Sequence, residues 1–284
     1  MRRSAAPANR PLRFVFASIV VIGLLGVGAP AGAAPEPAPS SMASLGDSIT
    51  RGFNACGWYV ECTSRSWSTG SSGSVQSHYL RLRALNPGLS GRNHNDARTG
   101  AQADDLARQA GLAVGQQAEY VTILIGANDA CTSSEATMTP TDTFRDQIDA
   151  GLAAIKGGLP GARVFVASIP DIYRLWEVGH GRAWVRFVWS QFGICQSMLA
   201  NPGSGNPADE ARRQRVRQRV IDYNAQLAAA CATFGPTCDF DGNAVFGYQF
   251  TLAEISPWDY FHPDTDGQRV LAEVTYEAGF VWTG

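Results

Sequence analysis

Short apolar runs alternate along the chain with stretches whose apolar residues recur at helical spacing. Three apolar runs have the character of strands buried on both faces, and they lie at 41–45, 121–125 and 164–169. Helical spacing occupies four stretches, at 75–85, 104–114, 143–155 and 208–234. Strands that alternate with helices predict an α/β fold, with a mostly parallel central sheet inside a three-layer α/β/α sandwich.

Two segments interrupt this alternation. Residues 52–73 are rich in Ser, Gly and Cys and indicate a long loop. Residues 175–207 form an insertion with five large aromatic residues, Trp176, Trp184, Phe187, Trp189 and Phe192. These rings suit either an acyl pocket or a lipid interface, because aromatic rings favour a half-wet boundary. The alternative is an ordinary secondary core, and the sequence does not decide between them.

The helical stretch at 208–234 carries a run of basic residues. These are Arg212, Arg213, Arg215, Arg217 and Arg219. A basic run on a helix most often marks a face turned to solvent, and we interpret this one in that way.

The first 33 residues have the pattern of a signal peptide. Four arginines precede an uncharged apolar run from Phe14 to Val27, and small residues follow at 31–33. The alternative is a membrane anchor, but the run is shorter than the roughly 20 residues that span a bilayer. We therefore expect a secreted protein in which residues 34–284 form one domain.

The charge balance argues against nucleic acid as a partner. Removal of residues 1–33 takes away four arginines and no acidic residue, so the formal net charge moves from −2 to −6. Nucleic-acid binding depends on clustered positive charge that neutralises phosphates. A monomer is expected.

Six cysteines remain after residue 33, and an even number in an exported protein indicates disulfides. Proximity in sequence favours Cys56–Cys62 and Cys231–Cys238, which leaves Cys131–Cys195 by elimination. A zinc site would need close CxxC or CxxH pairs, and the sequence contains none. We expect neither a metal nor another cofactor.

Nucleophilic ester cleavage needs a hydroxyl, a base, a group that orients the base, and donors for the oxyanion. Ser48 follows a predicted buried strand, where α/β proteins place their ligands. His262 is the strongest of the four histidines as a base, because Asp259 precedes it by three residues. Each signal alone is weak: Ser48 also suits a helix cap, and Asp-x-x-His is common. The G-x-S-x-G elbow of the α/β-hydrolases is absent from the sequence.

Four short motifs together resemble the sequence blocks of the SGNH/GDSL hydrolases. They occur in the family's order, and they are 44–50 (SLGDSIT), 98–101 (RTGA), 125–129 (IGAND) and 259–263 (DYFHP). The resemblance spans most of the chain after residue 33. It implies a flavodoxin-like fold and an ester hydrolase that works through an acyl-enzyme.

The resemblance also implies roles for the matching residues. Ser48 would be the nucleophile, and His262 would take its proton with Asp259 as the orienting acid. The N–H groups of Ser48 and Gly100 and the side-chain amide of Asn128 would form the oxyanion hole. In some relatives a backbone carbonyl orients the histidine instead, and Asp264 and Asp266 are also near, so Asp259 is the favoured alternative of several.

The substrate follows less directly. The surroundings of Trp58, Tyr59 and Trp67 resemble those of secreted bacterial lipases and phospholipases of this family, which favours esters of acyl lipids and a transient contact with a lipid interface. The first alternative is a carbohydrate O-deacetylase of the same fold. The second is a noncatalytic binding module, against which the four occupied motifs argue.

Overall fold

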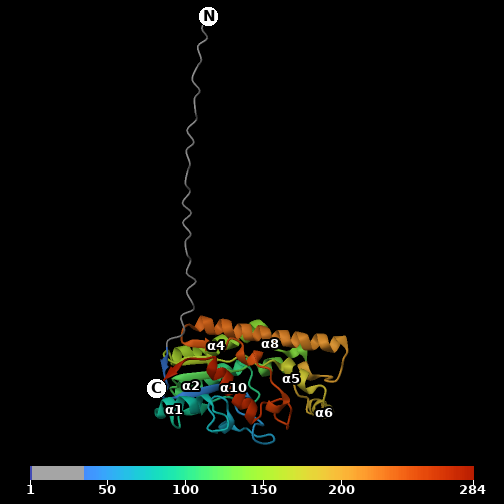
Figure 1. The fold of residues 1–284 in the computed structure, drawn as a ribbon, viewed down its shortest axis with the longest axis horizontal. Coiled ribbons are helices and arrows are strands. Elements are labelled where there is room, and N and C mark those ends of the chain that lie inside the picture. Colours follow the sequence, from blue (N-terminus) through green and yellow to red (C-terminus); the bar gives the residue numbers. More distant parts are fainter. Residues whose placement is uncertain (2–34) are drawn as a thin grey trace. The chain divides into compact units, whose positions relative to one another are not determined.

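A five-stranded parallel sheet lies at the centre of the protein in the computed structural model, which describes Met1 and residues 35–284 (Figure 1). The strand order is β3-β2-β4-β5-β6. The strands are β2 Met42–Gly46, β3 Asn93–Asn95, β4 Tyr120–Leu124, β5 Arg163–Val166 and β6 Cys238–Phe240. A separate parallel pair joins β1 (Glu36–Pro37) to β7 (Trp282–Thr283). The expected signal peptide, residues 1–33, lies outside the described residues apart from Met1.

Helices cover both sides of the sheet, as the sequence predicted. The longer helices are α1 His78–Leu85, α2 Leu106–Gly115, α4 Thr141–Gly158, α5 Ile172–Gly179, α6 Ala183–Gln191, α8 Pro207–Phe234 and α10 Thr265–Glu277. The single-turn helices are α3 Ala127–Ala130, α7 Gln196–Leu199 and α9 Ala244–Gly247. Helix α4 packs between α2 and α8, whereas α1 and α10 meet where His78 bonds to Thr275. Among the described residues no helix combines the length and apolarity that a membrane crossing requires.

The central strands β2 and β4 are completely buried, which explains why their sequences are apolar on both faces. The edge strands β3 and β6 are each three residues long and only partly buried. Neither strand is predictable from the sequence, because short polar edge strands lack the apolar run by which a buried strand is recognised.

The three disulfides are Cys56–Cys62 and Cys231–Cys238, which sequence proximity favoured, and Cys131–Cys195, which remained by elimination. The first closes a short surface loop. The second ties the end of α3 to the segment before α7, and the third joins α8 to β6.

The interpretation of the arginine run as a solvated face is wrong for its first two members, Arg212 and Arg213. Arg213 is buried, with its guanidinium 4.1 Å from the ring centre of Trp176 and its Nε 3.0 Å from Glu210 Oε2. Arg212 donates to backbone carbonyls around α7. Only Arg215 matches the expectation clearly, since more than half of its side chain is exposed. The run therefore attaches the insertion to α8.

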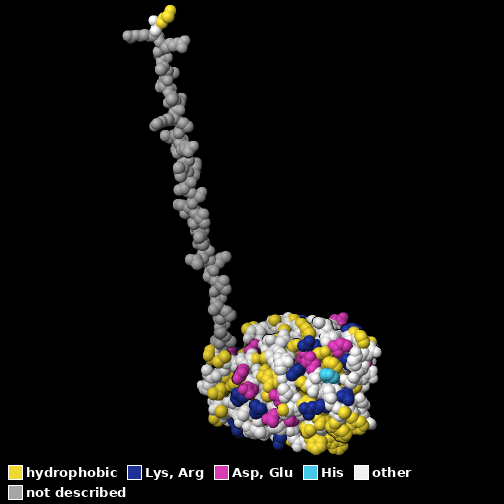
Figure 2. Space-filling model, turned by 45° about the vertical axis from the view of Figure 1, so that its right-hand side comes forward, with side chains coloured by type: hydrophobic (Ala, Val, Ile, Leu, Met, Phe, Trp, Pro, Cys, Tyr) yellow, Lys and Arg dark blue, Asp and Glu magenta, His cyan; other side chains and the backbone are white. Residues whose placement is uncertain are grey.

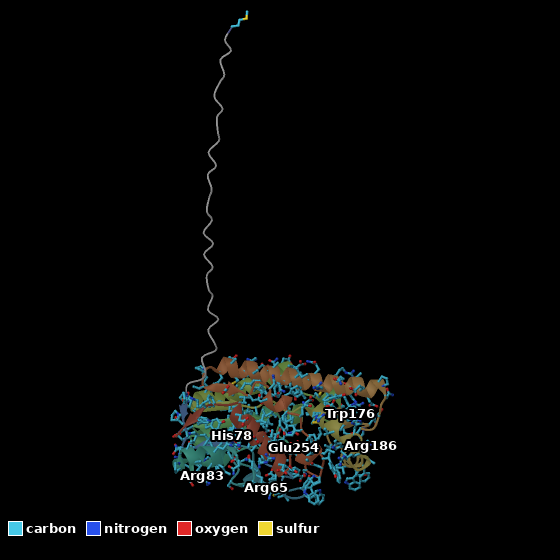
Figure 3. The ribbon with its side chains drawn as sticks, viewed as in Figure 1. Arg65, His78, Arg83, Trp176, Arg186 and Glu254 are labelled. Atoms are coloured by element: carbon cyan, nitrogen blue, oxygen red, sulfur yellow. A yellow bond between two sulfur atoms is a disulfide. The ribbon has the colours of Figure 1, made fainter. Side chains whose placement is uncertain are left out.

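The aromatic residues of the insertion divide between the two alternatives. Trp189 is fully buried, and its indole N–H donates to the carbonyl of Tyr260. Trp184, Phe187 and Phe192 are half or more exposed. Figure 3 shows Trp176 and Arg186 at the insertion end of the domain, away from Arg83 in α1. Part of the insertion is thus a secondary core, and part of it is an apolar surface.

Replacement of Arg213 by alanine is expected to lower the free energy of unfolding by about 2–4 kcal/mol. The change removes the cation–π contact with Trp176 and the hydrogen bonds from Arg213 to the carbonyl of Ser204 and to Oε2 of Glu210. Arg215→Ala is the matched control on the same helix, and its loss is expected to be much smaller. Urea denaturation measures both, and equal effects would contradict the structural role of Arg213.

Candidate active site

Ser48 lies just beyond the carboxyl end of β2, where the chain turns sharply. Gly46 has a φ of +147°, and a Cβ at this position would lie 2.3 Å from the carbonyl oxygen of Leu124 on β4. Only glycine permits this approach and this conformation. The turn presents Ser48 at the carboxyl edge of the sheet, where it is 5% exposed.

His262 and Asp259 arrive at the same point from the loop before α10. His262 Nε2 lies 2.8 Å from Ser48 Oγ, and His262 Nδ1 lies 2.6 Å from Asp259 Oδ2. These two contacts join residues 214 positions apart into one hydrogen-bonded chain. An imidazole held between a hydroxyl and a carboxylate is able to accept the hydroxyl proton during attack on a carbonyl.

The structure also places the alternative acids. Asp264 caps α10 by accepting hydrogen bonds from the N–H groups of Asp266 and Gly267. Asp266 lies 3.5 Å from Arg269 on the surface. Of the three acidic residues considered, Asp259 is the one in contact with the imidazole.

Asp259 is held by donors from two segments. Its Oδ1 accepts the N–H groups of Phe261 and His262, and its Oδ2 accepts Asn54 Nδ2 at 2.7 Å besides the imidazole. Burial alone would raise the pKa of this carboxyl. The hydrogen bonds and the charge interaction with His262 outweigh burial, so the pKa of Asp259 is below its ordinary value. The carboxylate is therefore ionised at neutral pH.

Two hydrogen bonds connect the expected oxyanion donors: one joins the Gly100 segment to the Ser48 turn, and the other joins Asn128 to the Gly100 segment. Arg98 N donates to the carbonyl of Gly46, and Asn128 Nδ2 donates to the carbonyl of Ala101. Gly100 adopts a φ of +80° between these links. Among the described residues no acceptor is bonded to the N–H of Ser48 or of Gly100. Both groups thus remain available to a ligand, as does the second amide hydrogen of Asn128.

Two buried glutamines that the sequence analysis did not identify fix the Ser48 turn. Gln109 of α2 accepts from Gly46 N at 2.7 Å and donates to Gly46 O at 2.9 Å. Gln268 of α10 donates to Ile49 O at 2.7 Å and accepts from Trp67 N. A single glutamine in an amphipathic helix forms no recognisable sequence motif. Its role in holding the turn is apparent only from its complete burial in the structure.

Asp47, next to Ser48, is also completely buried. Burial raises its pKa from the ordinary value of 3.8 to about 7, although the N–H of Ile49 donates to Oδ1 and opposes the shift. Its Oδ2 has no hydrogen-bond partner within residues 35–284. Asp129, beside Asn128, has its pKa raised to about 6 for the same reason, with Thr139 and Ala103 as opposing donors.

The other histidines lie elsewhere. His78 is buried between Tyr120 and Thr275, and burial lowers its pKa to about 3 (Figure 3). His180 stacks on Trp176 in the insertion. His94 is part of β3. Within residues 35–284, no three His, Cys, Asp or Glu side chains are grouped as metal ligands.

Two hollows flank His262. The first is a cavity with almost entirely apolar walls, which begins at Ile49 and Ala127, the neighbours of Ser48 and Asn128. Its remaining lining is Pro170, Asp171, Ile172, Leu175, Val178, Phe250, Ile255, Phe261 and Pro263. The second hollow includes His262 and Asp259 themselves. We call its four exposed aromatic side chains, Trp58, Tyr59, Phe192 and Trp258, the aromatic rim.

Hydrophobic side chains gather on the lower right of the surface in Figure 2, the part of the domain to which α6 belongs in Figure 1. Trp184 and Phe187 of α6 stack with ring centres 5.1 Å apart, and both are at least half exposed. Exposed aromatic groups of this size commonly mark an interaction surface.

Comparison with known proteins gives one sequence match and several structural matches. The profile of the GDSL-like Lipase/Acylhydrolase family matches residues 44–270. No curated protein sequence is significantly similar to the chain.

Solved structures with the same fold include enzymes that act on different esters. An acetylxylan esterase from Geobacillus stearothermophilus, solved as a catalytic mutant, is 18% identical, with a TM-score of 0.52 over 86% of this chain and 96% of its own. An extracellular lipase from Streptomyces rimosus is 20% identical, with a TM-score of 0.50 over 84% and 99%. Phospholipase A1 from Streptomyces albidoflavus is 17% identical, with a TM-score of 0.50 over 85% and 100%. These similarities establish the fold.

Replacement of Ser48 by alanine is expected to abolish labelling by a fluorophosphonate and nearly all turnover of a soluble nitrophenyl ester. Asp259→Asn is expected to lower turnover by about 10⁴-fold, because the amide disfavours the tautomer that presents a free nitrogen to Ser48. Asp266→Asn is the control and keeps wild-type turnover. A loss of less than tenfold in Asp259→Asn would show that this side chain does not orient His262.

The raised pKa of Asp47 predicts a stability that falls with pH. A carboxyl that binds its proton more tightly in the folded state destabilises the fold as pH rises from about 4 to about 7. The amide side chain of the variant Asp47→Asn cannot ionise. The free energy of unfolding of this variant should therefore fall less over the same pH range, with a difference of at most about 4 kcal/mol from wild type. Urea denaturation at pH 5 and pH 8 measures the difference, and equal declines in both proteins would contradict the shift.

Proposed function

Because the chain belongs to the GDSL-like lipase/acylhydrolase family, we propose that it is a secreted serine hydrolase that cleaves carboxylic esters of acyl lipids. The observation that carries the proposal is the hydrogen-bonded chain from Ser48 through His262 to Asp259, beside an apolar cavity.

In this mechanism Ser48 Oγ attacks the ester carbonyl while His262 Nε2 takes its proton. Asp259 keeps the imidazole oriented and stabilises the positive charge that develops on it. The N–H groups of Ser48 and Gly100 and the amide of Asn128 hold the oxyanion. Collapse of the tetrahedral intermediate expels the alcohol, to which His262 returns the proton, and an acyl-enzyme remains on Ser48. Water activated by His262 then releases the carboxylic acid.

The apolar cavity is the proposed site for the acyl chain. It begins at Ile49 and Ala127, beside the proposed nucleophile and an oxyanion donor, and continues between Leu175, Val178 and Phe250. Apolar walls favour a hydrocarbon chain, since each buried methylene contributes about 0.8 kcal/mol. An acetyl group would leave most of this lining uncovered.

The aromatic rim is the proposed contact with a lipid interface. Trp58 and Tyr59 are 60% and 76% exposed, although they lie in the same hollow as His262. Trp and Tyr rings are suited to the boundary between headgroups and acyl chains. Secretion is consistent with the three disulfides, which persist in oxidising compartments. No nucleic-acid partner and no second subunit are part of the proposal.

The test is a series of nitrophenyl esters from acetate to palmitate, followed by phosphatidylcholine. We expect octanoate to be preferred over acetate, with measurable phospholipid turnover. Val178→Trp should fill the cavity and lower kcat/KM for the octanoate ester by about tenfold or more. The kcat/KM for the acetate ester should change little. Val281→Trp, at an exposed position far along the chain, is the matched control.

Two outcomes would overturn parts of this proposal. Preference for acetate without phospholipid turnover would favour a carbohydrate O-deacetylase. Inertness toward every ester, together with no fluorophosphonate labelling, would favour a noncatalytic module.

A further inference from the structure

We propose that Asn54 is a positioning residue for the reaction, and that the disulfide loop (residues 56–62) holds it in place. The inference rests on the proposed function and extends it. Asn54 is 3% exposed and donates from Nδ2 to Asp259 Oδ2 at 2.7 Å. The same oxygen accepts the imidazole Nδ1 of His262, so the two donors jointly fix its position.

The conformation of Asn54 suits this task. Its φ is +59°, in the left-handed region that asparagine tolerates better than most residues. The backbone N–H donates to Val60 O at 2.8 Å, and the backbone carbonyl accepts Ser256 Oγ at 3.0 Å. Ser256 in turn donates its N–H to the carbonyl of His262. Asn54 therefore contacts the Asp259–His262 turn through both its side chain and its backbone.

The disulfide loop fixes the amide group of Asn54. The N–H of Tyr59 donates to Asn54 Oδ1 at 2.6 Å, which leaves Nδ2 directed at Asp259. The loop is closed by the bond from Cys56 to Cys62 and by an antiparallel bridge between Phe53 and Glu61. Closure limits the conformations of the loop, so the Tyr59 donor stays in place.

The other side of the loop contacts the oxyanion segment. Glu61 Oε1 accepts Thr99 Oγ1 at 2.6 Å, and its Oε2 accepts Arg51 Nε at 2.9 Å. Thr99 directly precedes Gly100, a proposed oxyanion donor. One loop thus reaches both the acid that orients the base and the segment that stabilises the oxyanion. Its tip carries Trp58 and Tyr59 of the aromatic rim.

Asn54→Gly is the main variant, because glycine accepts the positive φ and removes only the amide. We expect kcat for a soluble short-chain nitrophenyl ester to fall by about 10–100-fold, the effect of one hydrogen bond to a charged group. KM should change by less than about twofold, since Asn54 does not line the acyl cavity. Asn86→Ala removes a comparable amide from the C-cap of α1 and should leave kcat unchanged.

Asn54→Asp separates positioning from a merely structural role. The isosteric side chain keeps the acceptor for Tyr59 but puts a carboxylate oxygen against Asp259 Oδ2. Repulsion between two carboxylates favours a shared proton, so the loss of kcat should exceed that of Asn54→Gly at high pH and diminish as pH falls. Wild-type activity in Asn54→Asp would mean that only the Tyr59 contact matters, and it would overturn the proposal.

A double-mutant cycle with Asp259→Asn tests the route of the effect. If Asn54 acts through Asp259, Asn54→Gly should lower kcat by less than about threefold in the Asp259→Asn background, where the carboxylate is absent. An equal loss of kcat in both backgrounds would overturn the proposal, as would wild-type kcat in Asn54→Gly.

The double variant Cys56→Ser/Cys62→Ser opens the disulfide loop and should also lower kcat. Its effect on kcat should be non-additive with that of Asn54→Gly, because both changes act on the same contact. Thermal unfolding confirms that each variant is folded, and Asn54→Asp carries the test if Asn54→Gly does not fold.

The two proposals fail separately. A wild-type protein that is inert toward esters and unlabelled by the fluorophosphonate would refute the proposed function. An active wild type with an unaffected Asn54→Gly variant would refute only the role of Asn54.

Discussion

The close approach of β2 and β4 at their carboxyl ends is the constraint on which the site depends. Gly46 pairs with Leu124 in the sheet, and the space between them does not admit a Cβ. The chain can therefore turn immediately after the strand, so that Ser48 emerges at the sheet edge with an N–H that bonds to no acceptor in the described part of the chain. Gln109 and Gln268 hold the turn from α2 and α10, and α10 follows directly after the His262 loop. The same packing that supports the turn thus delivers the imidazole.

Three aspartates near this turn, of which Asp47 and Asp129 are buried and Asp259 is partly buried, show how hydrogen-bond donors decide whether a carboxyl group is ionised. Asp47 has the N–H of Ile49 for Oδ1 and, among residues 35–284, no donor for Oδ2, and its pKa is raised to about 7. Asp129 has two donors, and its pKa is raised less, to about 6. Asp259 has four donors, two of them from His262, and its pKa is lowered. Burial penalises all three charges, and donors offset the penalty only where they are numerous.

The insertion and the first turns of α8 place side chains contrary to the usual rule that charged groups are exposed and aromatic groups are buried. A guanidinium, that of Arg213, is buried under Trp176, while Trp184, Phe187 and Phe192 face outward. The buried arginine is stable because an aromatic face and a carboxylate compensate for lost hydration. The outward rings have no such local explanation. Of these, Phe192 belongs to the aromatic rim beside His262.

The sequence by itself determined the parts of the protein that local patterns encode. Apolar runs identified the central strands, and helical spacing identified α2, α4 and α8. Nearness in sequence suggested two disulfide pairs, and elimination suggested the third. The four motifs named Ser48, His262 and Asp259 before any contact was known. Tertiary structure decided the rest. The edge strands β3 and β6, the burial of Arg213, and the amides of Asn54, Gln109 and Gln268 carry no local signal. Asn54 and Asp259 are 205 positions apart, and their contact exists only because the fold brings a positive-φ asparagine beneath a distant carboxylate.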